Sequence, residues 1–235
     1  MEEEKDKMAQ FHYVEDYERL VSDLVARYPI DEAMSLAVGG GYDQIGEILS
    51  EILIQNGLIN GMKLIDLGCG SGRAAKAISK RRNIEYLGID IVEMLLDYAK
   101  TVCPSHYQFR RNVNLKIEEP EGIADMVCAF SLFTHLLHEE TYIYLREIHR
   151  CLKQGGKLIF SFLEFHQPTH WGIFAHTVND RYLGKTSHLN MFIERNVIEK
   201  WSQALGFHQL SFVDSTDKRW NGQALGQSIA ILTKP

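Results

Sequence analysis

The sequence predicts an α/β protein built on a doubly wound, mainly parallel sheet. From Gly61 onwards, short β-type runs alternate with amphipathic helical patterns, as in parallel strands connected by helices. The length of 235 residues, with 45% hydrophobic and 24% charged side chains, fits one globular domain with at most a small insertion. We therefore expect N-terminal helices, a sheet core at 61–235 and an insertion after the fifth strand.

Residues 1–60 are predicted to form a helical cap packed on that core. The apolar residues at helical spacing are Ile45, Ile48, Leu49, Ile52 and Leu53. Gly57 follows them as a stop signal. The turn at 39–42, which reads GGGY, is either a plain turn or a segment that closes over a site through Tyr42.

The β-type runs of the core are short and well separated. They are KLIDL (63–67), EYLGID (85–90), HYQF (106–109), DMVCAF (125–130) and KLIFSF (157–162), followed by HQLSFV (208–213) and SIAILT (228–233). Helices are expected from about Gly72, around Leu95, around Ile148 and from Val197 to Gly206. The stretch 165–196 fits neither period, and we interpret it as a lid that faces the substrate.

Charge and composition narrow the class of protein. The net charge of −6 and the pI near 5.9 argue against a nucleic-acid partner, because phosphate binding needs clustered Lys and Arg. The start, MEEEKDK, lacks the pattern of a signal peptide, and no apolar run approaches the roughly 20 residues of a membrane span. The four cysteines are scattered, and we expect reduced thiols, no membrane partner and a cytoplasmic location.

The most informative motif is KLIDLGCGSGR, in which an apolar strand leads into Gly68, Gly70 and Gly72. Glycines allow positive φ and let a ligand approach bare backbone at a helix N-terminus. The dinucleotide pattern GxGxxG would need a glycine where Arg73 stands. Asp66 before the loop would repel a phosphate and attract an amino group, a polarity that favours S-adenosylmethionine over NAD.

Asp90 closes the next predicted strand, 18 residues after Gly72. This is near the spacing at which an acidic side chain binds both hydroxyls of a ribose. Asp90 is equally placed to cap the helix that follows, and the sequence permits either role.

The motifs LIDLGCGSG, YLGID, DMVCAFSLFTHL and LREIHRCLKQGGKLIFSF, in this order, resemble the class I S-adenosylmethionine-dependent methyltransferase superfamily. The resemblance implies a Rossmann-like, seven-stranded sheet with an antiparallel last strand, and methyl transfer from S-adenosyl-L-methionine with S-adenosyl-L-homocysteine as product. It also implies the cofactor contacts, which are Asp66, Gly68, Cys69, Gly70, Gly72, Asp90, Ile91, Asn112, Val113 and Phe130. Asn112 and Val113 stand where the family often has an acidic residue that reads adenine.

His135, just after the fourth strand, is the candidate general base, because histidine can take a proton from the acceptor near neutral pH. A packing or capping role is the alternative.

Four polar residues follow the fifth strand near the expected acceptor pocket: Glu164, His166, His170 and His176. Their spacing fits no standard zinc pattern, so we predict no metal. The same stretch contains aromatic residues that are expected either to form a wall of the acceptor pocket or to anchor the stretch to the core. They are Trp171, Phe174, Tyr182 and Phe192.

The function predicted from the sequence is methyl transfer to oxygen or nitrogen of a small-molecule acceptor. A protein methyltransferase and a non-catalytic or regulatory S-adenosylmethionine-binding domain are the alternatives. A nucleic-acid methyltransferase lacks support, because no basic face is evident and the fourth strand ends in FSLF. The sequence specifies neither the acceptor nor the oligomeric state.

Overall fold

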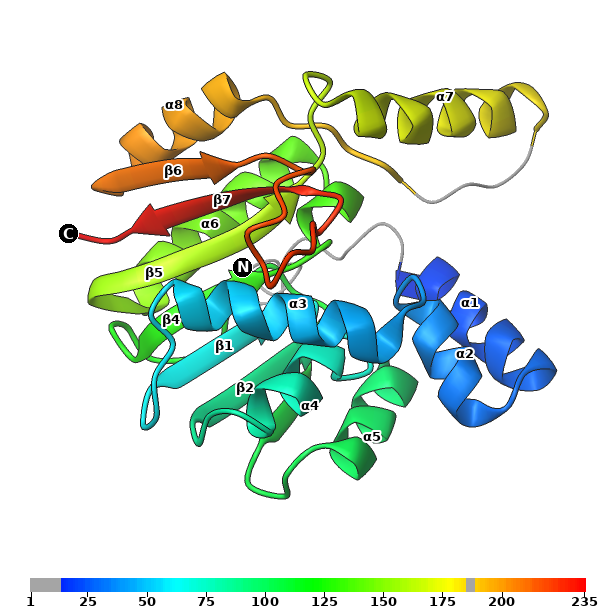
Figure 1. Cartoon of the computed structure of the whole chain (residues 1–235), viewed down its shortest axis with the longest axis horizontal. Coiled ribbons are helices and arrows are strands. Elements are labelled where there is room, and N and C mark those ends of the chain that lie inside the picture. Colours follow the sequence, from blue (N-terminus) through cyan, green and yellow to red (C-terminus); the bar gives the residue numbers. More distant parts are fainter. Residues whose placement is uncertain (1–13, 185–188) are drawn as a thin grey trace, which may run out of the picture. The chain divides into compact units, whose positions relative to one another are not determined.

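The computed structural model describes residues 14–184 and 189–235 (Figure 1). Its strands form a seven-stranded sheet in the order β3-β2-β1-β4-β5-β7-β6. This is the mainly parallel α/β fold that the sequence predicts, and the prediction of the fold class is confirmed.

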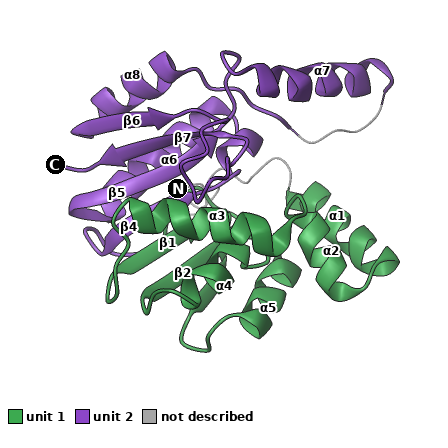
Figure 2. Ribbon diagram, in the orientation of Figure 1, with its two compact units in different colours: residues 1–118 green, residues 119–235 purple. Residues whose placement is uncertain are grey.

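The chain divides into two compact units, 1–118 and 119–235, shown in green and purple in Figure 2. The elements of unit 1 are the helices α1 (Val14–Arg27), α2 (Ile30–Ala37), α3 (Tyr42–Gln55), α4 (Arg73–Ser79) and α5 (Glu93–Val102) and the strands β1 (Lys63–Leu67), β2 (Glu85–Asp90) and β3 (Gln108–Arg111). The three helices before β1 agree with the predicted helical N-terminal region. The domain boundary at residue 60 stays a prediction.

The strands of unit 1 are parallel, with Lys63 opposite Glu85 and Leu87 opposite Gln108. Four of the five residues of β1 are buried, as expected of a strand covered on both faces. Helices α3 and α4 approach closely at Gly46, where a Cβ atom would lie 2.6 Å from the carbonyl oxygen of Arg73. A larger residue at this position would therefore separate the two helices.

Unit 2 contains four strands and the remaining helices. They are β4 (Ala124–Ala129), the short 3-10 helix η1 (Phe133–His135), α6 (His138–Cys151), β5 (Leu152–Phe162), α7 (Pro168–Tyr182), α8 (Arg195–Leu205), β6 (Gln209–Val213) and β7 (Ser228–Thr233). Strand β5 is parallel to β4, and β7 is antiparallel to both β5 and β6. The predicted antiparallel last strand is thus confirmed.

The core of unit 2 gathers aromatic side chains from β5 and its neighbours. Phe133 of η1 meets Phe160 edge to face at 5.0 Å between ring centroids, and Phe162 meets Phe212 in the same way at 5.9 Å. Phe133, Phe160 and Phe162 are fully buried. Because large buried rings make many dispersion contacts, these pairs fix the carboxyl end of β5.

Three predicted boundaries need correction. Strand β3 starts two residues later than expected and runs to Arg111, while β5 starts at Leu152, five residues before its predicted run. In addition, the stretch predicted to be irregular contains the 15-residue helix α7. This helix buries only His170. A helix that buries so little needs no continuous apolar stripe, so its sequence shows no helical period.

Within the described parts of the chain, no helix is long and apolar enough to cross a membrane.

Candidate functional site

The glycine loop of unit 1 leaves β1 and enters α4 with three glycines at positive φ. The angles are +70° at Gly68, +55° at Gly70 and +81° at Gly72. Backbone N–H groups of Gly68 and Cys69 both donate to the carbonyl oxygen of Ile89, at 2.8 and 3.1 Å. The loop is therefore bound to the end of β2 and reaches the N-terminus of α4 as bare backbone, which suits the close approach of a ligand.

Gly70 has no room for a side chain. A Cβ atom there would lie 2.6 Å from Cγ1 of Val38, which follows α2. We expect Gly70→Ala to lower the free energy of unfolding by about 2 kcal/mol or more, since it adds an overpacked contact to an unfavourable left-handed conformation. Urea unfolding of Gly70→Ala, Val38→Ala and the double variant measures both contributions.

In the double variant Cγ1 is gone, and the nearest remaining atom of residue 38 would be the Cβ, 3.8 Å away. The steric part of the loss at Gly70 should therefore be recovered, whereas the cost of positive φ should remain. Additive effects of the two single substitutions would show that Val38 does not restrict this loop.

Asp90 at the end of β2 fixes the loop from the other side. Its Oδ2 accepts a hydrogen bond from Gly70 N–H at 2.8 Å, and its Oδ1 accepts one from Val92 N–H at 3.0 Å. Burial raises the pKa of the Asp90 carboxyl, and the backbone hydrogen bonds from Val92 and Gly70 oppose this increase. The predicted role as the helix cap needs correction, because Val92 is the N-cap residue of α5 and Asp90 binds the N–H of Val92, before the first turn. The predicted ribose contact is compatible with the geometry, since each carboxylate oxygen has a further lone pair.

Asp66 is buried in β1 and held by a partner that the sequence does not indicate. The hydroxyl of Tyr86 donates to its Oδ2 at 2.6 Å. Burial lowers the pKa of the Arg73 guanidinium, and the negative charge of Asp66 partly restores it. Asp66 precedes the loop and Arg73 follows it, so the loop lies between an acidic and a basic residue, a pair that suits the two charged ends of an amino acid.

The N-terminal helices contact the loop directly. Tyr42, the first residue of α3, donates from its hydroxyl to the carbonyl oxygen of Ser71 at 2.7 Å, and Ser71 Oγ donates to the carbonyl oxygen of Met34 at 3.0 Å. The GGGY turn thus does more than reverse the chain, because it places Tyr42 on the glycine loop. Tyr17 of α1 carries no sequence signal for this site; burial raises its pKa, with a further contribution from the charge of Asp90.

The other predicted cofactor contacts of unit 1 differ in how their side chains lie. Cys69 is buried, and its sulfur would be 2.8 Å from a Cβ on Gly88, so the side chain packs onto β2. Ile91 packs against the buried cluster around Val92. Asn112 donates from its side chain to the carbonyl oxygen of Lys116 and accepts from Asn114 N–H. Its amide therefore closes the loop 112–116.

Within unit 2, the end of β4 has an unusual backbone conformation. Phe130 is buried there, and the next residue, Ser131, has φ of +55°, which is unusual for a residue other than glycine. Ser131 N–H donates to Ser161 Oγ at 2.7 Å, and both serine hydroxyls donate to Gln227 Oε1. Such strained positions concentrate at functional sites.

His135 ends η1, directly after this strained turn. Its Nδ1 lies 2.7 Å from the carbonyl oxygen of Leu189. A carbonyl oxygen only accepts, so Nδ1 carries the proton and the lone pair of the neutral ring lies on Nε2. His138, the first residue of α6, likewise donates from Nε2 to the carbonyl oxygen of Phe192 at 3.0 Å. The two histidines hold one segment, 189–193.

The four polar residues after β5 do not converge on one site. Glu164 and His170 are fully buried, whereas His166 and His176 are exposed. His170 connects the backbone of Glu164 to the carbonyl oxygen of Gly226, and His176 Nε2 lies 3.3 Å from Asp180. In the described part of the chain, no group of three or more His, Cys, Asp or Glu side chains could hold a metal ion.

Three of the four predicted aromatic residues cluster. Trp171, Phe174 and Phe192 surround Phe165, a residue that the sequence pattern does not single out. Tyr182, at the end of α7, is 88% exposed and lies outside this cluster.

The chain is similar to several known proteins. Residues 65–160 match the family model of the methyltransferase domain. The ubiquinone biosynthesis O-methyltransferase of Coxiella burnetii is 27% identical over 158 residues, which span 65% of this chain and 66% of the relative. Among solved structures, the magnesium protoporphyrin IX methyltransferase of Synechocystis, with bound S-adenosylhomocysteine, is 15% identical, with a TM-score of 0.65, over 94% of this chain and 97% of its own.

Residues 65–160 are therefore similar to a methyltransferase domain, and the fold of most of the chain is similar to that of S-adenosylmethionine-dependent methyltransferases. A further match, 16% identical with a TM-score of 0.67 over 94% of this chain and 98% of its own, is a Haloferax volcanii methyltransferase solved with its Trm112 activator. The matched region covers about two thirds of the length of the Coxiella relative.

Proposed function

We propose that this protein transfers the methyl group of S-adenosylmethionine to an oxygen or nitrogen atom of a small-molecule acceptor. The observation that carries the proposal is the glycine loop, whose three positive-φ glycines are fixed to the end of β2 by Asp90 and by the carbonyl of Ile89. The names of relatives point in the same direction, since they include the ubiquinone O-methyltransferase and a phosphoethanolamine N-methyltransferase of Haemonchus contortus.

The residues of unit 1 suit the three parts of this cofactor. Asp66 would bind the amino group of the methionine moiety, with Arg73 as the nearby positive charge for its carboxylate. Asp90 would accept both ribose hydroxyls, because a carboxylate oxygen that accepts one backbone hydrogen bond can accept another. Ile91 and the backbone of Asn112 and Val113 would contact the adenine, and Gly68, Cys69, Gly70 and Gly72 would offer main-chain atoms.

When bound, the cofactor supplies a methyl group already activated by a sulfonium, so the protein needs no nucleophile of its own. Its task is to align the acceptor and exclude water. In our proposal Phe130 borders the cofactor, and His135 accepts the acceptor's proton on Nε2 while Nδ1–H stays bound to the carbonyl oxygen of Leu189. The acceptor's lone pair forms the new bond to carbon, and the electron pair of the broken bond stays on sulfur.

Calorimetric titration with S-adenosylmethionine and, separately, with NAD tests the cofactor. We expect micromolar binding of the former and none of the latter. Formation of S-adenosylhomocysteine across a panel of phenols, catechols and amines then tests turnover. Preference for NAD would contradict the proposal, and tight cofactor binding without turnover on any acceptor would favour the non-catalytic alternative.

His135→Gln tests the base. Glutamine can still donate to the carbonyl oxygen of Leu189 but cannot take up a proton, so we expect kcat to fall by about 100-fold or more with little change in cofactor affinity. His138→Gln is the matched control, because His138 makes the same kind of bond to Phe192. Equal losses in both variants would show that these histidines only hold the segment 189–193.

The cytoplasmic location and the absence of nucleic-acid and membrane partners remain predictions from composition.

A further inference from the structure

We propose that the rings of Phe165, Trp171, Phe174 and Phe192, called here the aromatic cluster, bind the acceptor, and that the acceptor therefore carries a planar aromatic ring. This inference rests on the proposed methyl transfer and specifies its substrate class. The cluster lies wholly in unit 2, and all four residues belong to the described part of the chain.

The rings of the cluster are arranged for stacking rather than for filling a core. Phe165 and Phe192 are parallel, with centroids 4.4 Å apart and 8° between their planes. Phe174 meets both of them edge to face, at 5.1 and 5.8 Å. Trp171 lies 5.3 Å from Phe174 and 6.4 Å from Phe165. A flat ring added beside such a group gains both parallel and edge contacts.

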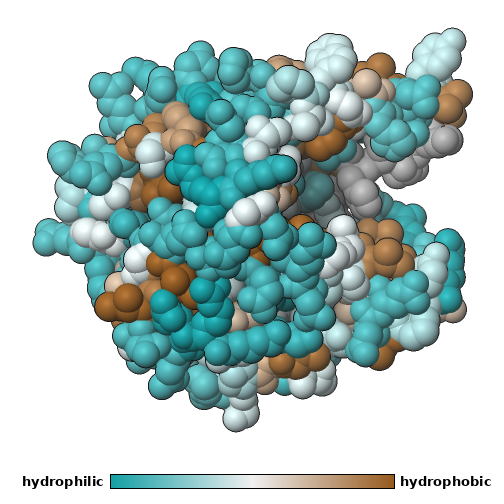
Figure 3. Space-filling model, in the orientation of Figure 1, coloured by the Kyte–Doolittle hydropathy of each residue, from teal (hydrophilic) through white to brown (hydrophobic). Residues whose placement is uncertain are grey.

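The cluster is open to solvent on one side. Phe165 is 45% exposed and Trp171 is 57% exposed, although both are large apolar side chains. Figure 3 shows hydrophobic residues among hydrophilic ones at the surface over α7. Four neighbouring aromatic rings that remain partly exposed indicate a binding surface more often than scattered apolar residues do.

The position of the cluster matches that of an acceptor. It follows the carboxyl end of β5, the side of the sheet at which parallel α/β proteins bind ligands. Phe192 is bonded through its carbonyl to His138, and Leu189, three residues earlier, is bonded to His135. One short segment therefore connects the aromatic cluster to the proposed base.

Within the described residues, the cation–ring contacts involve Tyr42, Phe212 and Trp220, and none involves a ring of the cluster. The acceptor's ring thus meets neutral π faces, while a hydroxyl or amine at its edge would reach toward the base. Stacking gives a planar ring an advantage over a saturated ring of the same size.

The inference can be tested with 4-tert-butylcatechol and its saturated counterpart 4-tert-butylcyclohexanol, added to protein saturated with S-adenosylhomocysteine. The protein is labelled with 5-fluorotryptophan, and Trp171→Leu assigns its signal among those of Trp201 and Trp220. We expect the catechol to shift the fluorine resonance of Trp171 and to bind at least about tenfold more tightly than the saturated compound. Phe165→Leu and Trp171→Leu should each weaken catechol binding about tenfold, measured by calorimetry.

Tyr182→Leu is the matched control, because it removes an aromatic ring from the same helix outside the cluster and should leave the affinity unchanged. Equal binding of the two compounds, or a response of Trp171 only to phosphatidylcholine vesicles, would overturn the inference, since the surface would then be merely apolar. If S-adenosylhomocysteine binds but the catechol leaves Trp171 unaffected, the aromatic acceptor fails while the proposed methyl transfer stands. If the protein does not bind S-adenosylhomocysteine at all, both the aromatic acceptor and the proposed methyl transfer are contradicted.

Discussion

Asp90→Ala is expected to weaken S-adenosylmethionine binding by about 100-fold or more. A hydrogen bond to a charged group contributes about 1.5–3 kcal/mol, and we propose two of them to the ribose. The substitution also leaves Gly70 N–H and Val92 N–H without their acceptor, so the glycine loop loses its bond to the end of β2. Calorimetric titration with S-adenosylmethionine measures the loss directly.

Two further variants separate binding from folding. Asp90→Asn keeps the shape of the side chain and one oxygen acceptor, so it should fold normally and bind with an intermediate affinity. Asp97→Ala removes a carboxylate of the same charge from α5, where Asp97 pairs with the exposed Lys100, and should bind like the parent protein. If Asp90→Asn and Asp97→Ala bind equally well, Asp90 has no role beyond holding α5.

The glycine loop could be predicted from the sequence because its physical requirements are local. Three closely spaced glycines between an apolar strand and a helix indicate a turn that needs positive φ, and all three do adopt it. Strands β1, β2 and β7 coincide with their predicted runs because their signal is local too. Buried strands such as these are short apolar runs bounded by turn residues.

The atoms that hold the loop and His135 could not be predicted, although Tyr42 is one candidate for closing over a site, because they come from distant parts of the chain. Tyr42 and Ser71 are 29 residues apart, and His135 and Leu189 are 54 apart. A carbonyl oxygen carries no signature in the sequence, so nothing local indicates that the backbone orients His135. The tautomer that suits a base is thus a property of the tertiary structure alone.

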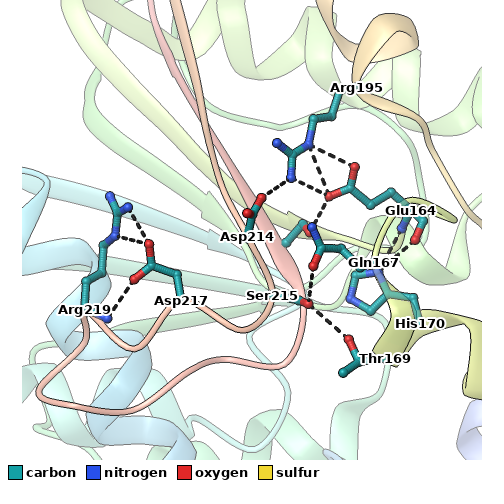
Figure 4. Close-up of polar contacts among 10 residues, drawn as sticks. Glu164, Gln167, Thr169, His170, Arg195, Asp214, Ser215, Asp217 and Arg219 are labelled. Carbon is teal, nitrogen blue, oxygen red and sulfur yellow. Dashed lines mark hydrogen bonds and ion pairs between the residues drawn. The ribbon is translucent and has the colours of Figure 1, made fainter.

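Helix α7 could not be predicted from the sequence because most of its side chains are not buried against other elements. Its sequence has Pro168 at the start and no apolar stripe, and periodicity detects a helix only where one face is buried. What holds its first turn is polar: His170 bonds to the backbone of Glu164 and Gly226, and Thr169 and Gln167 both contact Ser215 Oγ. Figure 4 shows these contacts converging from separate segments.

Glu164 is the centre of this polar group. Its fully buried carboxylate accepts two charge-assisted hydrogen bonds from Arg195, at 2.8 and 2.9 Å, and one from Ser228 Oγ. Arg195 also reaches Asp214, and the carboxylates raise the pKa of its guanidinium. These contacts join Glu164, just after β5, to the starts of α8 and β7. They therefore fix the segment that connects β5 to α7.

Arg195→Met should therefore cost more than Glu164→Gln. The first substitution leaves a carboxylate with 0% exposure without its positive partner, and we expect a loss of about 3–5 kcal/mol in the free energy of unfolding. The second leaves a guanidinium that is partly exposed and still paired with Asp214, together with an amide oxygen for Ser228, and should cost about 1–3 kcal/mol. Urea denaturation of the two variants measures both values.

Arg219→Met provides the comparison at the surface. Arg219 pairs with Asp217 through two nitrogens, as Arg195 pairs with Glu164, but both partners are accessible to water, and Figure 4 places the two pairs in one view. Exposed pairs contribute little, so no measurable change in stability is expected. If Arg195→Met were as harmless as Arg219→Met, the buried carboxylate would have to be stabilised by Ser228 alone. The position of α7, and of the aromatic cluster that depends on it, would then rest on packing rather than on this ion pair.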